Sequence, residues 1–113
     1  MTDALDANEP NPTYRDDILQ SDVDALAGPV LLNFGTNWCG HCQAAAPAIS
    51  NALKDFPPVK HIAVEDGPRR KFGRSFAVKL WPTLVFMKDG TEISRFVRPT
   101  DTDDIRAALQ TIS

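Results

Sequence analysis

The sequence predicts an α/β domain in which a central mixed β-sheet is flanked by α-helices on both faces. Helical and extended segments alternate along the chain in the order α-β-α-β-α-β-β-α, and alternation of this kind favours a sheet with helices on each face. The last three segments read as a hairpin followed by a helix, so some strands should be antiparallel. A length of 113 residues suits one domain and is too short for two.

The first dozen residues predict a flexible acidic tail, and residues 13–113 predict a single folded domain. Residues 1–12 are polar and aperiodic, and they contain two prolines. The charge is uneven along the chain. Residues 1–26 hold seven acidic residues and one arginine, whereas the rest of the chain holds eleven basic and eight acidic residues.

A first helix is expected directly after this tail. Thr13 is a suitable N-cap, and apolar residues follow it at helical spacing. These are Tyr14, Ile18 and Leu19. The helix should end before Gly28-Pro29, because this pair does not continue a helix.

A buried strand and a long helix follow. Residues 30–34 form a nearly continuous apolar run, which predicts a central strand covered on both faces. The alanine-rich segment from Cys39 to about Phe56 favours a helix. Pro47 lies inside this segment and should kink it.

A second strand and a third helix are expected next. Residues 59–65 predict a strand in which Ile62 and Val64 point to the same face. Gly67-Pro68 should open a helix that continues to about Phe76.

The end of the chain predicts a hairpin and a final helix. Residues 83–87 and 92–97 read as strands, and Asp89-Gly90 between them is a strong turn signal. The last helix should begin near Asp101 or Thr102. Its apolar residues recur at the spacing of one helix face and are Ile105, Ala108, Leu109 and Ile112.

Charge and hydropathy argue against two classes of protein. A weakly basic body with an acidic start is not typical of a nucleic-acid-binding domain. No segment approaches the roughly 20 apolar residues of a membrane span. The start of the chain is acidic and has no apolar core of a secretory signal, so we expect a cytoplasmic protein that binds neither nucleic acid nor membrane.

The main chemical signal is the pair Cys39 and Cys42 at the start of the long helix. Residues three apart on one helical turn place their Cα atoms about 5 Å from each other, within the range of a disulfide. The helix N-terminus stabilises a thiolate. We therefore expect Cys39, exposed at the helix edge, to be the nucleophile and the more buried Cys42 to resolve the mixed disulfide.

The two residues between the cysteines fit this chemistry. Gly40 presents no side chain, so a substrate chain can approach closely. As an imidazolium, His41 would favour the Cys39 thiolate and make the disulfide more oxidising. The alternative is that His41 is an exposed side chain with little effect on the thiols.

Three motifs together resemble the thioredoxin superfamily. Trp38-Cys39-Gly40-His41-Cys42 is similar to the active-site sequence of that family, in the form typical of protein disulfide isomerase domains. Pro47 matches the proline that kinks the active-site helix, and Trp81-Pro82-Thr83 matches the cis-proline loop. The resemblance covers roughly residues 29–112 and implies a thioredoxin fold.

The resemblance also bears on Pro82. The sequence alone favours a trans bond, because only about one X–Pro bond in twenty is cis in folded proteins. The family implies a cis bond that places this loop against the cysteines. It further implies that the backbone of Trp81 pairs with the substrate like an added strand.

Three positions depart from the family pattern. Asn33 stands where thioredoxins usually carry a buried aspartate that takes the proton of the resolving cysteine, and asparagine cannot do so. His61 replaces the lysine partner of that acid and is a candidate proton acceptor. His61 could equally be a strand histidine that is turned to solvent or simply hydrogen-bonded. Arg98 stands where a glycine usually lines the substrate groove, and it either narrows partner choice or is a solvated edge residue.

The sequence predicts neither a cofactor nor a metal. It holds no phosphate-binding glycine loop or dinucleotide fingerprint. Zinc would need four ligands, whereas the cysteine pair supplies two and the pattern does not bring His41 and His61 to it. The resemblance therefore implies electrons from another donor, such as a thioredoxin-reductase-like flavoprotein or glutathione.

Two function hypotheses remain open at this point. The first is a monomeric thiol–disulfide oxidoreductase that acts on client proteins with disulfides and contributes to cell redox homeostasis. The second is a redox-responsive protein-binding module whose Cys39–Cys42 pair regulates affinity for one partner without turnover. Covalent capture of many clients by Cys42→Ser would favour the enzyme.

Overall fold

The computed structural model describes residues 13–67, 70–99 and 101–113. The predicted tail of residues 1–12 lies outside this part of the chain. The predicted order of elements is confirmed. The helices are α1 (Gln20–Asp24), α2 (Gly40–Leu53), α3 (Lys71–Ser75) and α4 (Thr102–Gln110), and the strands are β1 (Pro29–Gly35), β2 (Lys60–Glu65), β3 (Thr83–Lys88) and β4 (Thr91–Val97).

The strands form one mixed sheet with the order β2-β1-β3-β4. β1 pairs parallel to β2 and antiparallel to β3, and β3 pairs antiparallel to β4. Asp89 and Gly90 have φ values of 52° and 80°. Positive φ at both central residues is the geometry that closes two-residue hairpins, so the predicted turn is confirmed.

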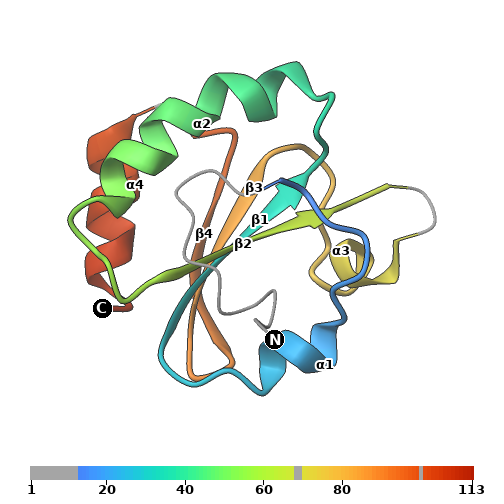
Figure 1. Ribbon diagram of the computed structural model, residues 1–113, viewed down its shortest axis with the longest axis horizontal. Coiled ribbons are helices and arrows are strands. Elements are labelled where there is room, and N and C mark those ends of the chain that lie inside the picture. Colours follow the sequence, from blue (N-terminus) through green and yellow to red (C-terminus); the bar gives the residue numbers. More distant parts are fainter. Residues whose placement is uncertain (1–12, 68–69, 100) are drawn as a thin grey trace.

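The helices cover both faces of the sheet, as predicted (Figure 1). One face packs against α2 and α4, and its core cluster includes Leu31, Ile49, Phe86 and Leu109. The opposite face packs against α1 and α3, and its cluster includes Val23, Leu32, Phe34, Ile62, Val64, Phe72 and Met87. Successive residues of β1 therefore point to opposite cores, which explains the unbroken apolar run.

The predicted first helix is wrong for residues 13–19, because only Gln20–Asp24 are helical. Arg15 instead forms a parallel bridge with Val64 in β2. The Arg15 N–H donates to the carbonyl of Ala63 at 3.1 Å, and the N–H of Glu65 donates to the carbonyl of Arg15 at 2.8 Å. Pairing with the edge of β2 satisfies the hydrogen bonds of the backbone N–H and C=O groups as a helical turn would. The contact with β2 therefore outweighs the helical spacing of the apolar residues.

The third helix is also shorter than predicted and begins at Lys71. The expected start at Gly67-Pro68 falls partly outside the described residues. In the described part, the Arg70 N–H donates to the carbonyl of Gly67 at 3.0 Å, which makes a turn before the helix. Within residues 13–67, 70–99 and 101–113, no helix combines the length and the apolar character needed to cross a membrane.

Candidate functional site

The two cysteines lie at the N-terminus of α2. Cys39 is the N-cap residue, with φ −77° and ψ 121°, and its side chain takes the place of the usual oxygen acceptor. The backbone N–H of Cys42 donates to the Cys39 sulfur at 3.3 Å. A sulfur in this position faces the positive end of the helix dipole, which favours its ionised form.

Both thiols are largely covered. Cys39 keeps 8% of its surface exposed and Cys42 keeps 4%. Cys42 is therefore the more buried of the two, as expected, but the prediction of an exposed Cys39 is wrong. Burial, followed by its hydrogen bond with Cys39, raises the pKa of Cys42 to about 11, although the neighbouring Thr36 backbone and Tyr14 hydroxyl oppose this rise.

The outer side of the cysteine pair is formed by Trp38, Gly40, His41 and Trp81. Trp38 is 72% exposed, and Gly40 and His41 are exposed as well. The Trp38 ring meets the Trp81 ring edge to face, with 5.6 Å between centroids. Of the residues expected to contact substrate, Trp38, Gly40 and His41 are thus accessible on this side, whereas Pro82 and Thr83 are buried.

The loop before β3 adopts the conformation that the resemblance implied. The Trp81–Pro82 peptide bond is cis. The Trp81 indole N–H donates to Asp66 Oδ2 at 2.8 Å, and the Thr83 hydroxyl donates to the carbonyl of Leu80 at 2.7 Å. Both ends of the loop are therefore held by side-chain hydrogen bonds.

Arg98 holds this loop from the other side, which the sequence did not indicate. Its backbone N–H donates to the carbonyl of Pro82 at 2.8 Å, and its Nε donates to the carbonyl of Trp81 at 2.9 Å. Its φ of 53° lies in the left-handed region, which costs a residue other than glycine about 1 kcal/mol. Arg98 is therefore an exposed residue whose side chain is fixed to the loop.

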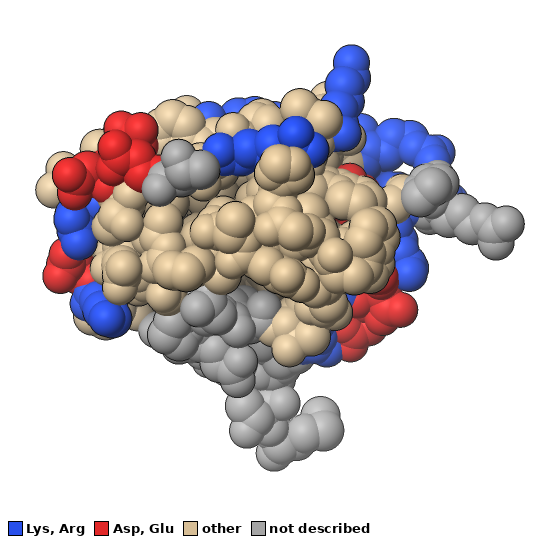
Figure 2. Space-filling view, turned by 90° about the horizontal axis from the view of Figure 1, so that it is seen from above, with Lys and Arg blue, Asp and Glu red and all other residues tan. Residues whose placement is uncertain are grey.

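The surface around the outer side carries little charge. Helix α2 contains no Lys, Arg, Asp or Glu. In the view from above, on the side where α2 lies, the middle of the face is uncharged, and charged groups of both signs lie along its border (Figure 2). The surface over α2 is therefore uncharged, and charged side chains lie around it.

Behind Cys42 lies a small polar cavity of about 140 Å³, which we call the rear pocket. It is lined by Tyr14, Asn33, Thr36, Asn37, Cys42, Gln43, Ala46 and His61. Asn33 and His61 are only 4% and 3% exposed, and Asn33 Nδ2 lies 3.2 Å from His61 Nε2. The interpretation of His61 as a solvent-facing strand residue is therefore wrong.

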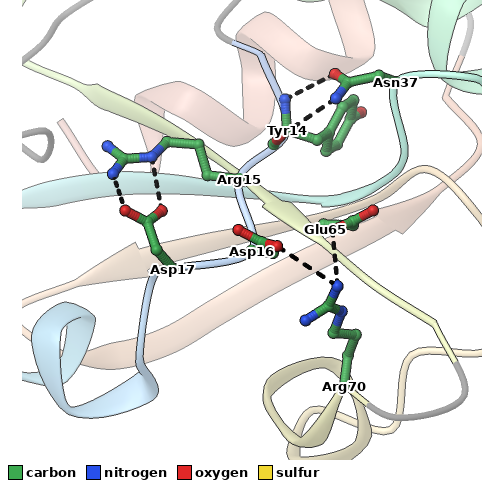
Figure 3. Close-up of polar contacts among 7 residues, drawn as sticks. All are labelled: Tyr14, Arg15, Asp16, Asp17, Asn37, Glu65 and Arg70. Atoms are coloured by element: carbon green, nitrogen blue, oxygen red, sulfur yellow. Dashed lines mark hydrogen bonds and ion pairs between the residues drawn. The ribbon is translucent and has the colours of Figure 1, made fainter.

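Tyr14 completes the rear pocket and was not identified from the sequence. Its hydroxyl donates to Asn33 Oδ1 at 2.7 Å. Its backbone N–H donates to Asn37 Oδ1 at 2.9 Å, and Asn37 Nδ2 donates back to its carbonyl at 3.3 Å (Figure 3). No local pattern predicts these contacts, because the partners lie 19 and 23 residues further along the chain.

Ion pairs fix the extended segment that carries Tyr14 (Figure 3). Arg15 pairs with Asp17. Arg70, just before α3, lies 3.7 Å from Asp16 and 3.0 Å from Glu65. Exposed pairs of this kind are worth at most about 1 kcal/mol each, so the backbone pairing with β2 supplies most of the anchoring.

Gly35 gives the rear pocket its space. A Cβ added at this position would lie 2.4 Å from the Cys42 sulfur and 3.0 Å from Cε1 of Tyr14. Any side chain here would therefore collide with the thiol and press on the tyrosine ring. The glycine lets both groups approach the same part of β1.

The described residues contain no group of three or more His, Cys, Asp and Glu side chains placed to hold a metal ion. His41 is exposed on the outer side and His61 is buried in β2. The site as described is a dithiol with an open outer side and a polar pocket behind it.

Comparisons with known proteins agree with this arrangement. The family model described as thioredoxin matches residues 11–111. The chain is 31% identical to a thioredoxin of Chlamydia trachomatis over 84 residues, which cover 74% of this chain and 82% of the relative. It is also 38% identical over 87 residues to human protein disulfide-isomerase A2, a match that spans 72% of this chain and 17% of the relative.

Among solved structures, the chain is similar to thioredoxin 2 from Pseudomonas aeruginosa PAO1 in its reduced form. The two are 48% identical with a TM-score of 0.78, and the match covers 88% of this chain and 94% of the other. Sequence and fold thus point to the same family.

Proposed function

Because the chain belongs to the thioredoxin family, we propose that it exchanges disulfides of client proteins through its Cys-Gly-His-Cys motif. Disulfide oxidoreduction is the general activity of this family, and the chain shares it. The observation that carries the proposal is the hydrogen bond of 3.3 Å from the Cys42 N–H to the Cys39 sulfur at a helix N-terminus. This geometry favours a thiolate at Cys39 and keeps a second thiol one turn away.

In the proposed reaction Cys39 acts as the nucleophile. Its thiolate attacks one sulfur of the client disulfide, a Cys39–client disulfide forms, and the other client sulfur leaves as a thiolate. The Cys42 thiolate then attacks Cys39, the Cys39–Cys42 disulfide forms, and the second client thiolate leaves. The client gains two electrons and the dithiol loses two.

The second step requires that Cys42 lose its proton. Burial disfavours this ionisation, and Asn33 cannot accept a proton. We propose that His61 accepts it, because the imidazole lines the same rear pocket as the thiol and a neutral imidazole accepts protons near neutral pH.

The outer side would receive the client. Trp38 gives an exposed apolar surface next to Cys39, and Gly40 leaves free space on its other side in the chain. The resemblance to the family suggests that the backbone of Trp81, before Pro82 and Thr83, pairs with the client chain. Arg98 Nε already donates to the carbonyl of Trp81. A client N–H that donates to this carbonyl therefore has to displace the guanidinium or share the oxygen with it.

The oxidised protein needs a donor to be reduced again. The proposed donors are a flavoprotein similar to thioredoxin reductase, or glutathione, in keeping with a role in cell redox homeostasis. We propose a monomer that works in the cytoplasm.

The direct test is turnover of an insulin-type disulfide with a dithiol reductant. Wild-type protein should catalyse the reduction, Cys39→Ser should abolish it, and Cys42→Ser should accumulate mixed disulfides with many proteins. Absence of turnover by folded, reduced wild-type protein would contradict the proposal. If Cys42→Ser captures no client while one partner binds in a redox-dependent way, the chain is a binding module instead.

The direction of electron flow depends on His41. Equilibration with glutathione should give a potential above the value of about −270 mV of ordinary thioredoxins. His41→Pro removes the imidazole and serves as the matched variant, whose potential should fall toward that value. Equal potentials for both proteins would show that His41 does not tune the thiols.

A further inference from the structure

The Tyr14 hydroxyl lies between two groups that change during resolution. It donates to Asn33 Oδ1 at 2.7 Å, and it lines the rear pocket together with the Cys42 thiol, whose pKa it lowers. Gly35 allows the tyrosine ring and the thiol to meet, because a Cβ at that position would touch both. The hydroxyl has one proton and can donate to only one partner at a time.

The observed pattern suits a protonated Cys42. The Tyr14 hydroxyl donates to Asn33 Oδ1, and Asn33 Nδ2 lies 3.2 Å from His61 Nε2. Since the amide nitrogen is a donor, His61 Nε2 is the acceptor and the ring is neutral. The Tyr14 proton is then engaged by Asn33 and is not available to the sulfur.

A proton on His61 Nε2 reverses this pattern. Two donors would then face each other, so the Asn33 amide has to turn and present its oxygen to the imidazolium. The amide nitrogen now donates to the Tyr14 oxygen, and the Tyr14 proton becomes available to the Cys42 sulfur. Tyr14, Asn33 and His61 each keep a partner in both patterns, whereas the buried Thr36 hydroxyl has none in the structure.

We propose that Tyr14, Asn33 and His61 form a hydrogen-bond relay that supplies a donor to the Cys42 thiolate when His61 takes its proton. This inference rests on the proposed function, because resolution by Cys42 is the step that it serves. One proton moves from the Cys42 sulfur to His61 Nε2, and no electron moves until the thiolate attacks Cys39. The cavity of about 140 Å³ that all four residues line is large enough for water to carry this proton.

Tyr14 is a positioning residue in this scheme. Burial raises its pKa well above the ordinary range, and the neighbouring Cys42 adds to the rise. Its hydroxyl therefore stays protonated and remains a donor near neutral pH, where a neutral imidazole can accept a proton. Among the described residues, the titratable groups facing Cys42 are Cys39 from the start of α2, Tyr14 from the extended segment and His61 from β2.

The test separates the two chemical steps with an aromatic disulfide that releases a coloured thiol at each one. The first release reports attack by Cys39 and the second reports resolution by Cys42. Tyr14→Phe keeps the ring and removes only the hydroxyl. The matched control is Ser50→Ala, which removes a hydroxyl that donates to the carbonyl of Pro47 at 3.2 Å elsewhere in α2.

Tyr14→Phe should leave the first release unchanged and slow the second by about tenfold or more, the usual effect of losing a hydrogen bond to a charged group. The pH midpoint of the second release should also move to higher pH, which a purely structural change would not cause. Ser50→Ala should match wild type in both releases.

The outcomes are distinguishable from failure of the proposed function. If wild-type protein shows no second release, resolution by Cys42 is wrong and so is the oxidoreductase mechanism. If wild type shows both releases and Tyr14→Phe gives the same rates and the same pH midpoint, only the relay is overturned. Thermal unfolding of both variants confirms that each is folded during the assay.

Discussion

The outer side and the rear pocket lie next to the same cysteine pair, but their residues differ in exposure. On the outer side, Trp38 is 72% exposed and Gly40 has free space in place of a side chain. In the rear pocket, Asn33 and His61 are almost fully buried and hydrogen-bonded. The outer side is open to solvent, whereas the polar side chains of Asn33 and His61 in the rear pocket are buried.

This difference shows where the site tolerates change. Replacing an exposed side chain changes the free energy of unfolding little, because water takes over its contacts. A buried polar group leaves its partner unsatisfied when it is removed. Substitutions in the rear pocket should therefore damage stability and resolution, whereas those on the outer side should change client preference.

The strongest test compares two glycines on the two sides. Gly35→Ala would place a Cβ 2.4 Å from the Cys42 sulfur, and we expect it to destabilise the protein by about 1–3 kcal/mol through overpacking. Gly40→Ala meets no atom within 4 Å and should stay within about 0.5 kcal/mol of wild type. Urea unfolding of the reduced proteins measures both. If Gly35→Ala is as stable as wild type, the rear pocket is not more tightly packed than the outer side.

The second test uses alkaline pH. Cys42 has a folded-state pKa of about 11 against an ordinary value of 9.0, so the unfolded chain releases this proton first. Stability should be fully present below about 9 and should fall by on the order of 2 kcal/mol as pH rises to about 11. The reduced Cys42→Ala variant should lack this part of the loss. An identical decline in both proteins would show that the thiol does not contribute.

A smaller effect is expected from the tryptophans. Trp81→Phe removes the indole donor to Asp66 Oδ2 and should cost about 1.5 kcal/mol, because the lost hydrogen bond has a charged acceptor. Trp38→Phe changes a ring that is 72% exposed and should cost less than about 0.5 kcal/mol. Denaturant unfolding gives both values. Equal costs would mean that Trp38 contributes more to stability than its exposure suggests.

The smallest effect is expected for Arg98→Gly. Glycine relieves the cost of φ 53°, while the lost Nε bond to the Trp81 carbonyl removes a similar amount. The net change in unfolding free energy should be below about 1 kcal/mol. The KM for protein disulfides should change more than kcat, because the carbonyl becomes free for the client. A change confined to kcat would show that Arg98 does not limit the access of the client to the Trp81 carbonyl.

The sequence predicts most of the sheet and the outer side. The apolar run of β1, the Asp89-Gly90 turn and the apolar face of α4 each carry a periodic or local signal, and each lies where it was expected. The motif around Cys39 and the loop at Pro82 were predicted through resemblance to the family. Without the resemblance, the low frequency of cis X–Pro bonds favours a trans bond at Pro82.

The rear pocket could not be predicted in full. Tyr14, Ile18 and Leu19 have helical spacing, yet Leu19 is 63% exposed and Tyr14 reaches the thiols through an extended segment. The contacts that decide this outcome join residues far apart in the chain, and no window of sequence contains both partners. Asn33 and His61 were identified as departures, but their separation of 3.2 Å follows only from strand register.

The bridge between Arg15 and Val64 has a consequence for biosynthesis. A ribosome delivers the segment around Tyr14 about fifty residues before the strand that receives it. During that interval the backbone of Arg15 has no strand edge to pair with, and the cysteine helix is completed first. The nascent chain thus acquires its dithiol before it acquires the pocket wall behind it, and a ribosome-bound fragment ending before β2 should expose a more accessible Cys42 than the finished protein.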